Sequence, residues 1–397
     1  MKAVDSRTII YSDYQATTPL DPLVVEKMNP LWSDSFGNPH SSDHIVGWQA
    51  AKVVTAATES IATLIGAGPD EVIFTSGATE ANNLALLGLA RRTIKKRHRI
   101  LVSAIEHKSI LETAQTLEKQ MGFTVDTIPV DKQGRIDLGA LERLLDETVL
   151  VVSAMAVNNE IGTIQDIPKI ASLLESHGIL FHCDAAQAPS AMDLRDIATH
   201  TDLASLSAHK IYGPQGIGAL YIRRDIQNQV EPLIYGGSQQ EGLRSGTVPV
   251  ALCAGMGAAC DILTSPDITE ERMRVAKYRD TFVELLQDSS FPVIVNGPDV
   301  ENRHPGNTNL QFPNFDAHEI LAALQPWLAA STGSACTSGT PQPSHVLNAI
   351  GLTKDQSKSS MRFSFGRFTS NDEIEKAALL VHGTLDHLES ESYKKSA

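Results

Sequence analysis

The chain of 397 residues has little of what several classes of protein require. It has only four cysteines, none of them in a Cys-x-x-Cys pair, so the sequence predicts neither a disulfide framework nor a structural zinc site. No apolar run is long enough to cross a bilayer, and the first residues lack the apolar core of a signal peptide. We therefore expect a reducing, cytoplasmic setting and no membrane association.

Basic residues are also in the minority, with 33 Lys and Arg against 47 Asp and Glu and a formal net charge of −14. This balance argues against a broad nucleic-acid-binding face. The composition, with 42% hydrophobic and 20% charged residues, is that of a globular protein large enough for one large domain and a smaller one. The sequence shows neither internal repeats nor low-complexity segments.

Apolar runs and amphipathic stretches alternate through the first two thirds of the chain, which is typical of βα units. The strand patterns lie at about 71–75, 99–103, 123–130, 149–156, 179–183 and 202–206, and the helix patterns at about 22–32, 79–91, 137–146 and 166–177. Residues 218–222 read as an antiparallel return strand.

A turn at residues 265–267 marks the predicted domain boundary. A long charged helix at about 269–288 follows, with strands at about 291–295 and 307–312. Strands after a helix without a strict βα order predict a small α+β domain.

A lysine follows one of the strand patterns, just before a Gly/Pro-rich turn. Lys210 has Ser207 and His209 beside it, and the turn covers residues 213–218. A lysine at a strand end beside hydroxyl and imidazole groups can lose its proton and bond covalently to an aldehyde cofactor. Taken alone, a lysine before a turn is more often an ordinary surface residue.

A second motif has the geometry for holding a phosphate. Residues 76–80 read Ser-Gly-Ala-Thr-Glu between a strand pattern and a helix pattern. The free N–H groups and the positive end of such a helix attract an anion, and glycine allows close approach. By itself this motif is weak, because Thr79 with Glu80 can also mark only a helix start.

One cysteine, Cys336, lies in a run of small residues at 331–340. A thiol there could be exposed and mobile, and a reactive cysteine needs access and thiolate character. A spare thiol in a linker is the alternative. Cys253 and Cys260 lie in an apolar helical run, and Cys183 ends a strand pattern, so we expect all three to pack as small hydrophobes.

Together these motifs resemble the group I cysteine desulfurases (IscS- and NifS-like), which belong to the class V aminotransferase-like enzymes. The likeness is carried by residues 13–19 (Asp-Tyr-Gln-Ala-Thr-Thr-Pro), 207–221, 331–338 and 362–368, and so covers nearly the whole chain. It implies pyridoxal 5'-phosphate and the α/β fold-type I of the PLP-dependent transferases, with a mostly parallel seven-stranded sheet. It further implies a large domain of residues 17–264 and a small α+β domain of residues 1–16 and 265–397 that carries the Cys336 loop.

The resemblance also assigns site residues. Lys210, Cys336 and His107 would be catalytic, His107 by stacking on the cofactor ring and taking part in proton transfer. The cofactor would be bound by Ala78, Thr79, His107, Asn159, Asp184, Gln187, Ser207, His209, Lys210 and, from the other subunit of a homodimer, Thr247. Asn38 and Arg362 would bind the substrate carboxylate, and no metal is implied.

Two of these assignments also follow from side-chain chemistry. A carboxylate at Asp184 can pair with a protonated pyridine nitrogen, although a strand-end Asp alone is more often a helix cap. An arginine at position 362 can form a bidentate pair with an amino acid carboxylate, although a surface salt bridge is the alternative. Asn158, one residue before Asn159, is expected to be structural.

The predicted reaction converts L-cysteine to L-alanine and a persulfide on Cys336, which acceptor proteins or thiols then collect. The destination stays open among iron–sulfur cluster assembly, tRNA thiolation and DNA phosphorothioation, and no direct nucleic-acid binding is expected. Selenocysteine lyase, another PLP-dependent lyase or aminotransferase, and a partner-dependent sulfur-relay subunit are the alternatives, because a fold does not fix its chemistry.

Overall fold

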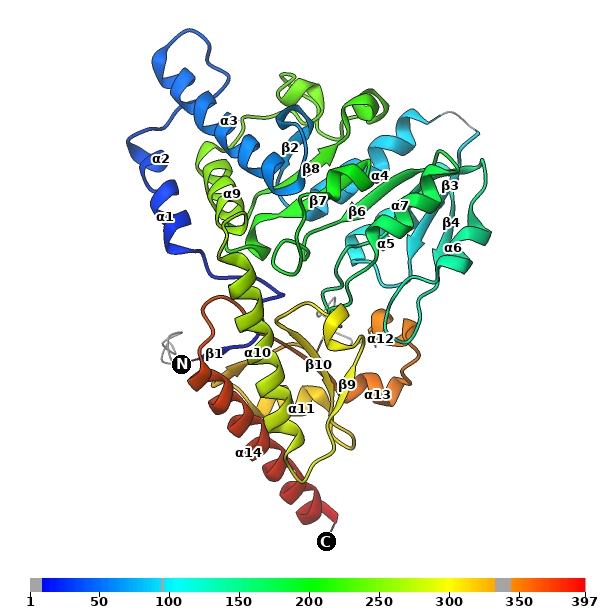
Figure 1. Ribbon diagram of the computed structural model, residues 1–397, viewed down its shortest axis with the longest axis vertical. Coiled ribbons are helices and arrows are strands. Elements are labelled where there is room, and N and C mark those ends of the chain that lie inside the picture. The colour runs from blue at the N-terminus through cyan, green and yellow to red at the C-terminus, as the bar shows by residue number, and fades with distance from the viewer. Residues whose placement is uncertain (1–8, 94–95, 333–343, 397) are drawn as a thin grey trace.

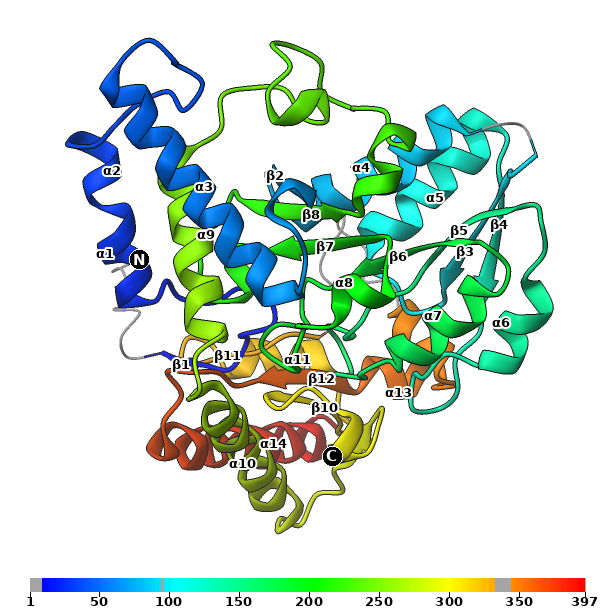
Figure 2. The ribbon, with the colours of Figure 1, turned by 45° about the horizontal axis from the view of Figure 1, so that its top comes forward.

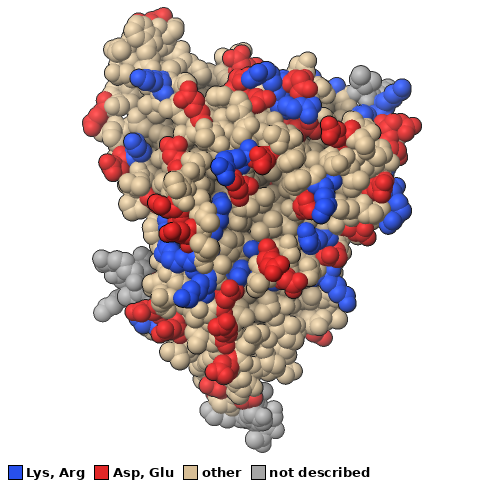
Figure 3. Space-filling view, in the orientation of Figure 1, with Lys and Arg blue, Asp and Glu red and all other residues tan. Residues whose placement is uncertain are grey.

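The computed structural model describes residues 9–93, 96–332 and 344–396. Figure 1 shows a broad body built on a large sheet and, below it, a narrower body that contains the first and the last described residues. No helix in the described part of the chain has the length and apolar character needed to cross a membrane. Acidic and basic side chains are interspersed over the face in Figure 3, so neither sign forms a broad field there.

The broad body contains the predicted seven-stranded sheet. Its order is β2 (Val72–Thr75), β8 (Gly218–Ile222), β7 (Leu203–Ser207), β6 (Leu180–Asp184), β5 (Val149–Ser153), β3 (Arg99–Ser103) and β4 (Thr124–Ile128). Only β8 runs against its neighbours, pairing antiparallel with both β2 and β7. The α/β fold with a mostly parallel sheet is confirmed.

Helices cover both faces of this sheet, because successive strand residues point to opposite sides. Ile100 and Val102 of β3 pack with α4 (Ala78–Arg92) and α5 (Lys108–Met121) in one core. Leu101, between them, belongs to the other core, with α3 (Ile45–Ile65), α7 (Ile167–Glu175) and α9 (Val250–Leu263). Figure 2 shows α3 and α9 side by side at one end of the sheet. Burial on both faces explains why the strands read as continuous apolar runs.

The shorter helices of the broad body complete its outline. These are α1 (Pro22–Met28), α2 (Pro30–Ser33), α6 (Leu138–Leu144) and α8 (Ile197–His200). The predicted helix at 22–32 is divided in two, since Pro30 has no N–H to continue the helical hydrogen bonds. Helix α3, the longest of this body among the described residues, was not among the predicted helices.

The narrower body has its own sheet and core. An antiparallel sheet of order β12 (Ser360–Ser364), β10 (Asn307–Gln311) and β9 (Ile294–Asn296) packs with α10 (Ile268–Gln287), α11 (Ala317–Ala323) and α14 (Asn371–Ser396). Phe282, Phe312, Phe363 and Phe365 are fully buried at its centre. Strand β9 begins at Ile294 rather than the predicted 291, because Pro292 cannot donate to a sheet. This separate core supports the division at residues 16/17 and 264/265, which remains a proposal.

Residues 12–21 connect the two bodies. Strand β1 (Ile10–Tyr11) pairs with β11 (Leu328–Ala329) in the narrower body, and Ser12 O then accepts from Ser364 N at 2.8 Å. Thr18 N donates to His209 O at 2.9 Å in the broad body. The chain therefore runs along the junction, directly beside the turn that contains Lys210.

Candidate active site

A pocket of about 530 Å³ opens where the parallel strands end. The carboxyl ends of parallel strands meet at one edge of a sheet, where α/β proteins place their ligands. Strands β6 and β7 end there at Asp184 and Ser207. Among the residues that line this pocket are nine that the sequence predicted: Ala78, Thr79, His107, Asn159, Asp184, Gln187, Ser207, His209 and Lys210.

Lys210 lies at the end of the short helix η3 (Ala208–Lys210), immediately after β7. Its Nζ donates to the main-chain oxygens of Gln15 at 2.6 Å and Ala16 at 2.8 Å. Burial, with the positive charge of Arg362, lowers the pKa of Lys210 to about 8. About a tenth of this amine is therefore unprotonated at pH 7, far more than for an ordinary lysine.

The N-terminus of α4 faces the same pocket. Gly77 caps the helix without a side-chain hydrogen bond, and its φ of 151° is one that residues with a Cβ rarely adopt. A Cβ built on Gly77 meets nothing within 4 Å, so the space beside the helix end is open. The first N–H groups of α4 and the hydroxyl of Thr79 are thus placed to receive an anion.

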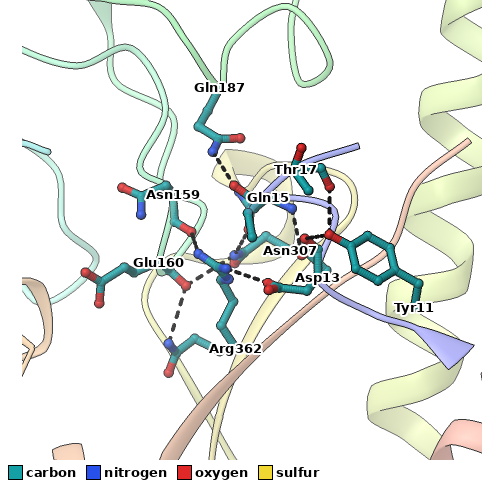
Figure 4. A network of polar contacts seen from close by, with 12 residues as sticks. Tyr11, Asp13, Gln15, Thr17, Asn159, Glu160, Gln187, Asn307 and Arg362 are labelled. Carbon is teal, nitrogen blue, oxygen red and sulfur yellow. Dashed lines mark hydrogen bonds and ion pairs between the residues drawn. The ribbon is translucent and has the colours of Figure 1, made fainter. Parts of the chain in front are cut away.

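Arg362 lies on β12 beside the pocket (Figure 4). Its Nη1 donates to Asn159 O at 2.8 Å, and its Nη2 donates to Asp13 Oδ1 at 2.5 Å. Asn158 is structural, as expected: it is buried, its Nδ2 donates to Ile105 O, and its Oδ1 accepts from Glu160 N.

The structure does not bring two of the predicted residues to the pocket. Asn38 is exposed in the loop between α2 and α3, where its Oδ1 accepts from His40 N. Thr247 is exposed between the short helix η5 (Gln240–Gly242) and α9. The assignment of Thr247 concerns the other subunit of a homodimer, and the assignments of both residues remain predictions.

Cys336 lies outside the described residues, but the chain on either side of it is described. Ser331 and Arg362 exchange main-chain hydrogen bonds of 3.1 and 2.6 Å. Ser344 Oγ donates to Glu160 Oε2 at 2.5 Å. The described chain before Cys336 therefore ends beside Arg362, and the described chain after it begins beside Glu160. The other three cysteines are fully buried, as predicted.

A model of the class-V aminotransferase family matches residues 10–377. The chain belongs to this family. It is 42% identical over 379 residues to the cysteine desulfurase IscS of Rickettsia bellii, covering 96% of this chain and 92% of the relative.

Solved structures agree with this assignment. The fold matches a NifS-like protein with a TM-score of 0.88 and 32% identity, over 95% of this chain and 99% of the other. It also matches the structure of SspA in complex with cysteine, with a TM-score of 0.79 and 35% identity, over 91% and 99%. The enzyme is accordingly dependent on pyridoxal phosphate.

The donors around the pocket suit this cofactor of the class-V aminotransferases. An uncapped helix end with a nearby hydroxyl fits a phosphate, and an amine of low pKa fits an aldehyde. Asp184 supplies the carboxylate that a pyridine nitrogen requires. Among the described residues, no group of three or more His, Cys, Asp or Glu side chains is placed to hold a metal ion.

Asn82, which the sequence interpretation missed, holds Asp184. Its Nδ2 donates to Asp184 Oδ2 at 2.8 Å and to Ser109 Oγ at 2.9 Å, and the residue is fully buried. A signal was present, because Asn82 is four residues after Ala78 and so lies on the same helix face. Ala186 N donates to the other carboxylate oxygen at 3.0 Å.

His107 caps α5, where its Nδ1 accepts from Ser109 N at 3.1 Å and contacts Ser109 Oγ at 2.8 Å. Burial lowers the pKa of His107. With Nδ1 accepting, the neutral imidazole carries its proton on Nε2. Capping and the predicted ring stacking are therefore compatible roles for one side chain.

A buried histidine two residues before Asp184 makes the stability of the fold dependent on pH. His182 lies between the hydroxyls of Ser153 and Ser205, at 2.9 and 3.0 Å, and burial lowers its pKa to about 4. In the unfolded chain this histidine is protonated below about pH 6.5, whereas in the folded chain it stays neutral down to about pH 4. The neutral His182 therefore stabilises the fold fully above pH 6.5, and this stabilisation is lost as the pH falls toward 4. The loss amounts to about 3 kcal/mol of unfolding free energy.

We expect His182→Gln to unfold with a weaker pH dependence than the wild type between about pH 6.5 and 4. Urea unfolding at several pH values measures this slope. His177→Gln, at an exposed histidine close to the end of α7, is the matched control and should keep the wild-type slope. Equal slopes in the two variants would contradict the assignment.

Proposed function

We propose that this chain is a cysteine desulfurase that converts L-cysteine to L-alanine and a persulfide on Cys336. One observation carries the proposal: Lys210, Asp184 and the N-terminus of α4 line a single pocket, with Arg362 beside it. The relationship to the IscS of Rickettsia bellii and to SspA, which was solved with cysteine, supports the choice of substrate.

The cofactor supplies an electron sink for the α-carbon of the amino acid. Lys210 would hold it covalently and would also take up the α-proton, for which a pKa of about 8 is well suited. Asp184, held by Asn82 and Ala186, would stabilise a positive charge on the ring nitrogen. Thr79, Ser207, His209 and the helix end would bind the phosphate, and Asn159 and Gln187, which line the same pocket, would bind the phenolic oxygen.

Arg362 and Asn38 bind the carboxylate of L-cysteine. The thiolate of Cys336 attacks the substrate sulfur, so that an S–S bond forms while the C–S bond breaks. The carbon keeps the electron pair of that bond and takes up a proton, which yields alanine. The persulfide on Cys336 then passes to an acceptor thiol or protein.

The working form is a homodimer in which Thr247 reaches the partner subunit's cofactor. Support comes from large apolar side chains that stay exposed on neighbouring elements at one end of the broad body (Figure 1). Leu23, Trp32, Phe36 and Trp48 are all more than half exposed on α1, α2, α3 and the loop before α3. Apolar surface of this extent is typical of a protein interface.

We expect Trp32→Asp to weaken this dimer, because a charge within an apolar interface loses its hydration. Sedimentation at falling protein concentration would show dissociation at a concentration at least tenfold above the wild-type value, about 1.4 kcal/mol. Trp327→Asp is the matched control, since Trp327 is 54% exposed but lies beside β11 of the narrower body. Dissociation of the control alone would place the interface elsewhere.

The sulfur acceptor and the compartment are the remaining parts of the proposal. Iron–sulfur cluster assembly, tRNA thiolation and DNA phosphorothioation all use persulfide sulfur, and a cytoplasmic setting fits four cysteines without a disulfide framework. An acceptor that raises the rate sharply would favour the partner-dependent relay.

The direct test is the stoichiometry of the products. The purified enzyme, given L-cysteine and a reducing thiol, should release alanine and sulfide in equal amounts. Sulfide without alanine would exclude this reaction, because the C–S bond would then be broken in a reaction with a different carbon product. Pyruvate, or an amino group moved to a keto acid, would favour the lyase or aminotransferase alternatives, and a strong preference for selenocysteine would favour the selenocysteine lyase.

A further inference from the structure

Residues 13–16 contact two cations that come from different bodies of the molecule. Asp13 Oδ1 accepts from Nη2 of Arg362, which lies on β12 (Figure 4). The main-chain oxygens of Gln15 and Ala16 accept from Nζ of Lys210, which follows β7. A segment of four residues thus holds both side chains at once.

The segment itself is fixed from both sides. Gln15 N donates to Ser364 Oγ at 2.9 Å, and Asn307 Nδ2 donates to Gln15 Oε1 at 2.5 Å, both from the narrower body. Gln187 Nε2, from the broad body, donates to Gln15 O at 2.9 Å. Gln15 and Asn307 are buried, so water does not compete for these bonds.

Two of the three guanidinium nitrogens of Arg362 have hydrogen-bond partners among the described residues, and the third has none. Nη1 bonds to Asn159 O and Nη2 to Asp13, and the side chain is only 5% exposed. Within the described chain, its Nε has no hydrogen-bond partner. A buried donor without an acceptor is costly, and the described residues do not supply the acceptor that this Nε needs.

We propose that Asp13 is a positioning residue that fixes the guanidinium of Arg362 for the substrate carboxylate and balances the charge near Lys210. The carboxylate would bind the guanidinium of Arg362 while Asp13 stays bound to Nη2. The first part rests on the proposed function, since it requires that Arg362 bind the substrate; the second part concerns the chain alone.

The charges that face Lys210 support the second part. Arg362 lowers the pKa of Lys210, while Asp13 and Asp184 raise it. Desolvation lowers the pKa values of His107 and His209, and the nearby Lys210 lowers them further. When the negative charge of Asp13 is removed, the positive charge of Arg362 is less well balanced. The pKa of Lys210 therefore falls.

The test uses the full chain with its cofactor removed. Competitive labelling of lysines, read by mass spectrometry across a range of pH, gives the pKa of Lys210 in the wild type, Asp13→Asn and Asp13→Glu. Asp13→Asn keeps an acceptor but loses the charge, so its pKa should fall by roughly half a unit or more. Asp13→Glu restores the charge and should return the pKa toward the wild-type value. Asp34→Asn, at an exposed aspartate beside Ser33, is the matched control.

The second readout is the KM for L-cysteine of the holoenzyme. Asp13→Asn should raise KM roughly tenfold with a smaller change in kcat, because the guanidinium of Arg362 is then less ordered. A lower KM would overturn the positioning role and make Asp13 a competitor of the substrate. An unchanged pKa would overturn the charge balance. If neither the wild type nor any variant turns over L-cysteine, the proposed function is wrong. The pKa of Lys210 from the labelling experiment still tests whether Asp13 balances the charge.

Discussion

Lys210→Ala should release alanine from L-cysteine roughly a thousandfold more slowly than the wild type, or slower still. In the proposed mechanism the amine is both the covalent attachment point for the cofactor and the group that moves the α-proton, and the structure offers no second lysine among the described residues that line the pocket. Burial and the charge of Arg362 lower the pKa of Lys210 to about 8. This matters because only the unprotonated form of the amine can take up the α-proton. Alanine release at saturating L-cysteine measures the loss.

The same variant should also lose the visible absorbance of the covalently bound cofactor after dialysis. Lys169→Ala is the matched control, because that lysine is exposed and pairs with Asp166 on α7. Lys210→Arg should be as inactive as the alanine variant, since a guanidinium keeps its proton at all ordinary pH values. Activity within tenfold of the wild type in either Lys210 variant would show that another group holds the cofactor.

The sequence predicted much of the fold because its strands are buried on both faces. Such strands appear as uninterrupted apolar runs, and the polar residues that follow them necessarily gather at one edge of the sheet. Asp184 and Lys210 therefore line one pocket although 25 residues of chain separate them. The division of the first helix at Pro30 was also readable in the sequence, and the prediction missed it.

Other parts of the site depend on contacts that no local pattern encodes. Asp13 and Arg362 are 349 positions apart, and only the packing of β12 against residues 12–14 brings them together. Asn82 looks like an ordinary helix residue until β6 places Asp184 opposite it. The resemblance to a known family assigned Arg362 to the substrate but left Asp13 as part of a turn.

A second large effect is expected at Cys336. Cys336→Ser should lose sulfide and alanine release together, roughly a thousandfold, because a serine hydroxyl is a much weaker nucleophile and cannot carry a persulfide. L-Cysteine should still change the visible spectrum of the variant, since Lys210, Asp184 and Arg362 are untouched. Cys253→Ala is the matched control, as Cys253 is fully buried in α9 and burial raises the pKa of its thiol.

The spectrum and the products together separate the two halves of the reaction. A spectral change without products places the defect after substrate binding, at the step that breaks the C–S bond. Sulfide release that survives in Cys336→Ser would remove this cysteine from the reaction. The three described cysteines could not replace it, because all are fully buried and burial raises the pKa of each thiol. Sulfur would then have to leave to an external thiol, and the enzyme would be a lyase rather than a persulfide donor.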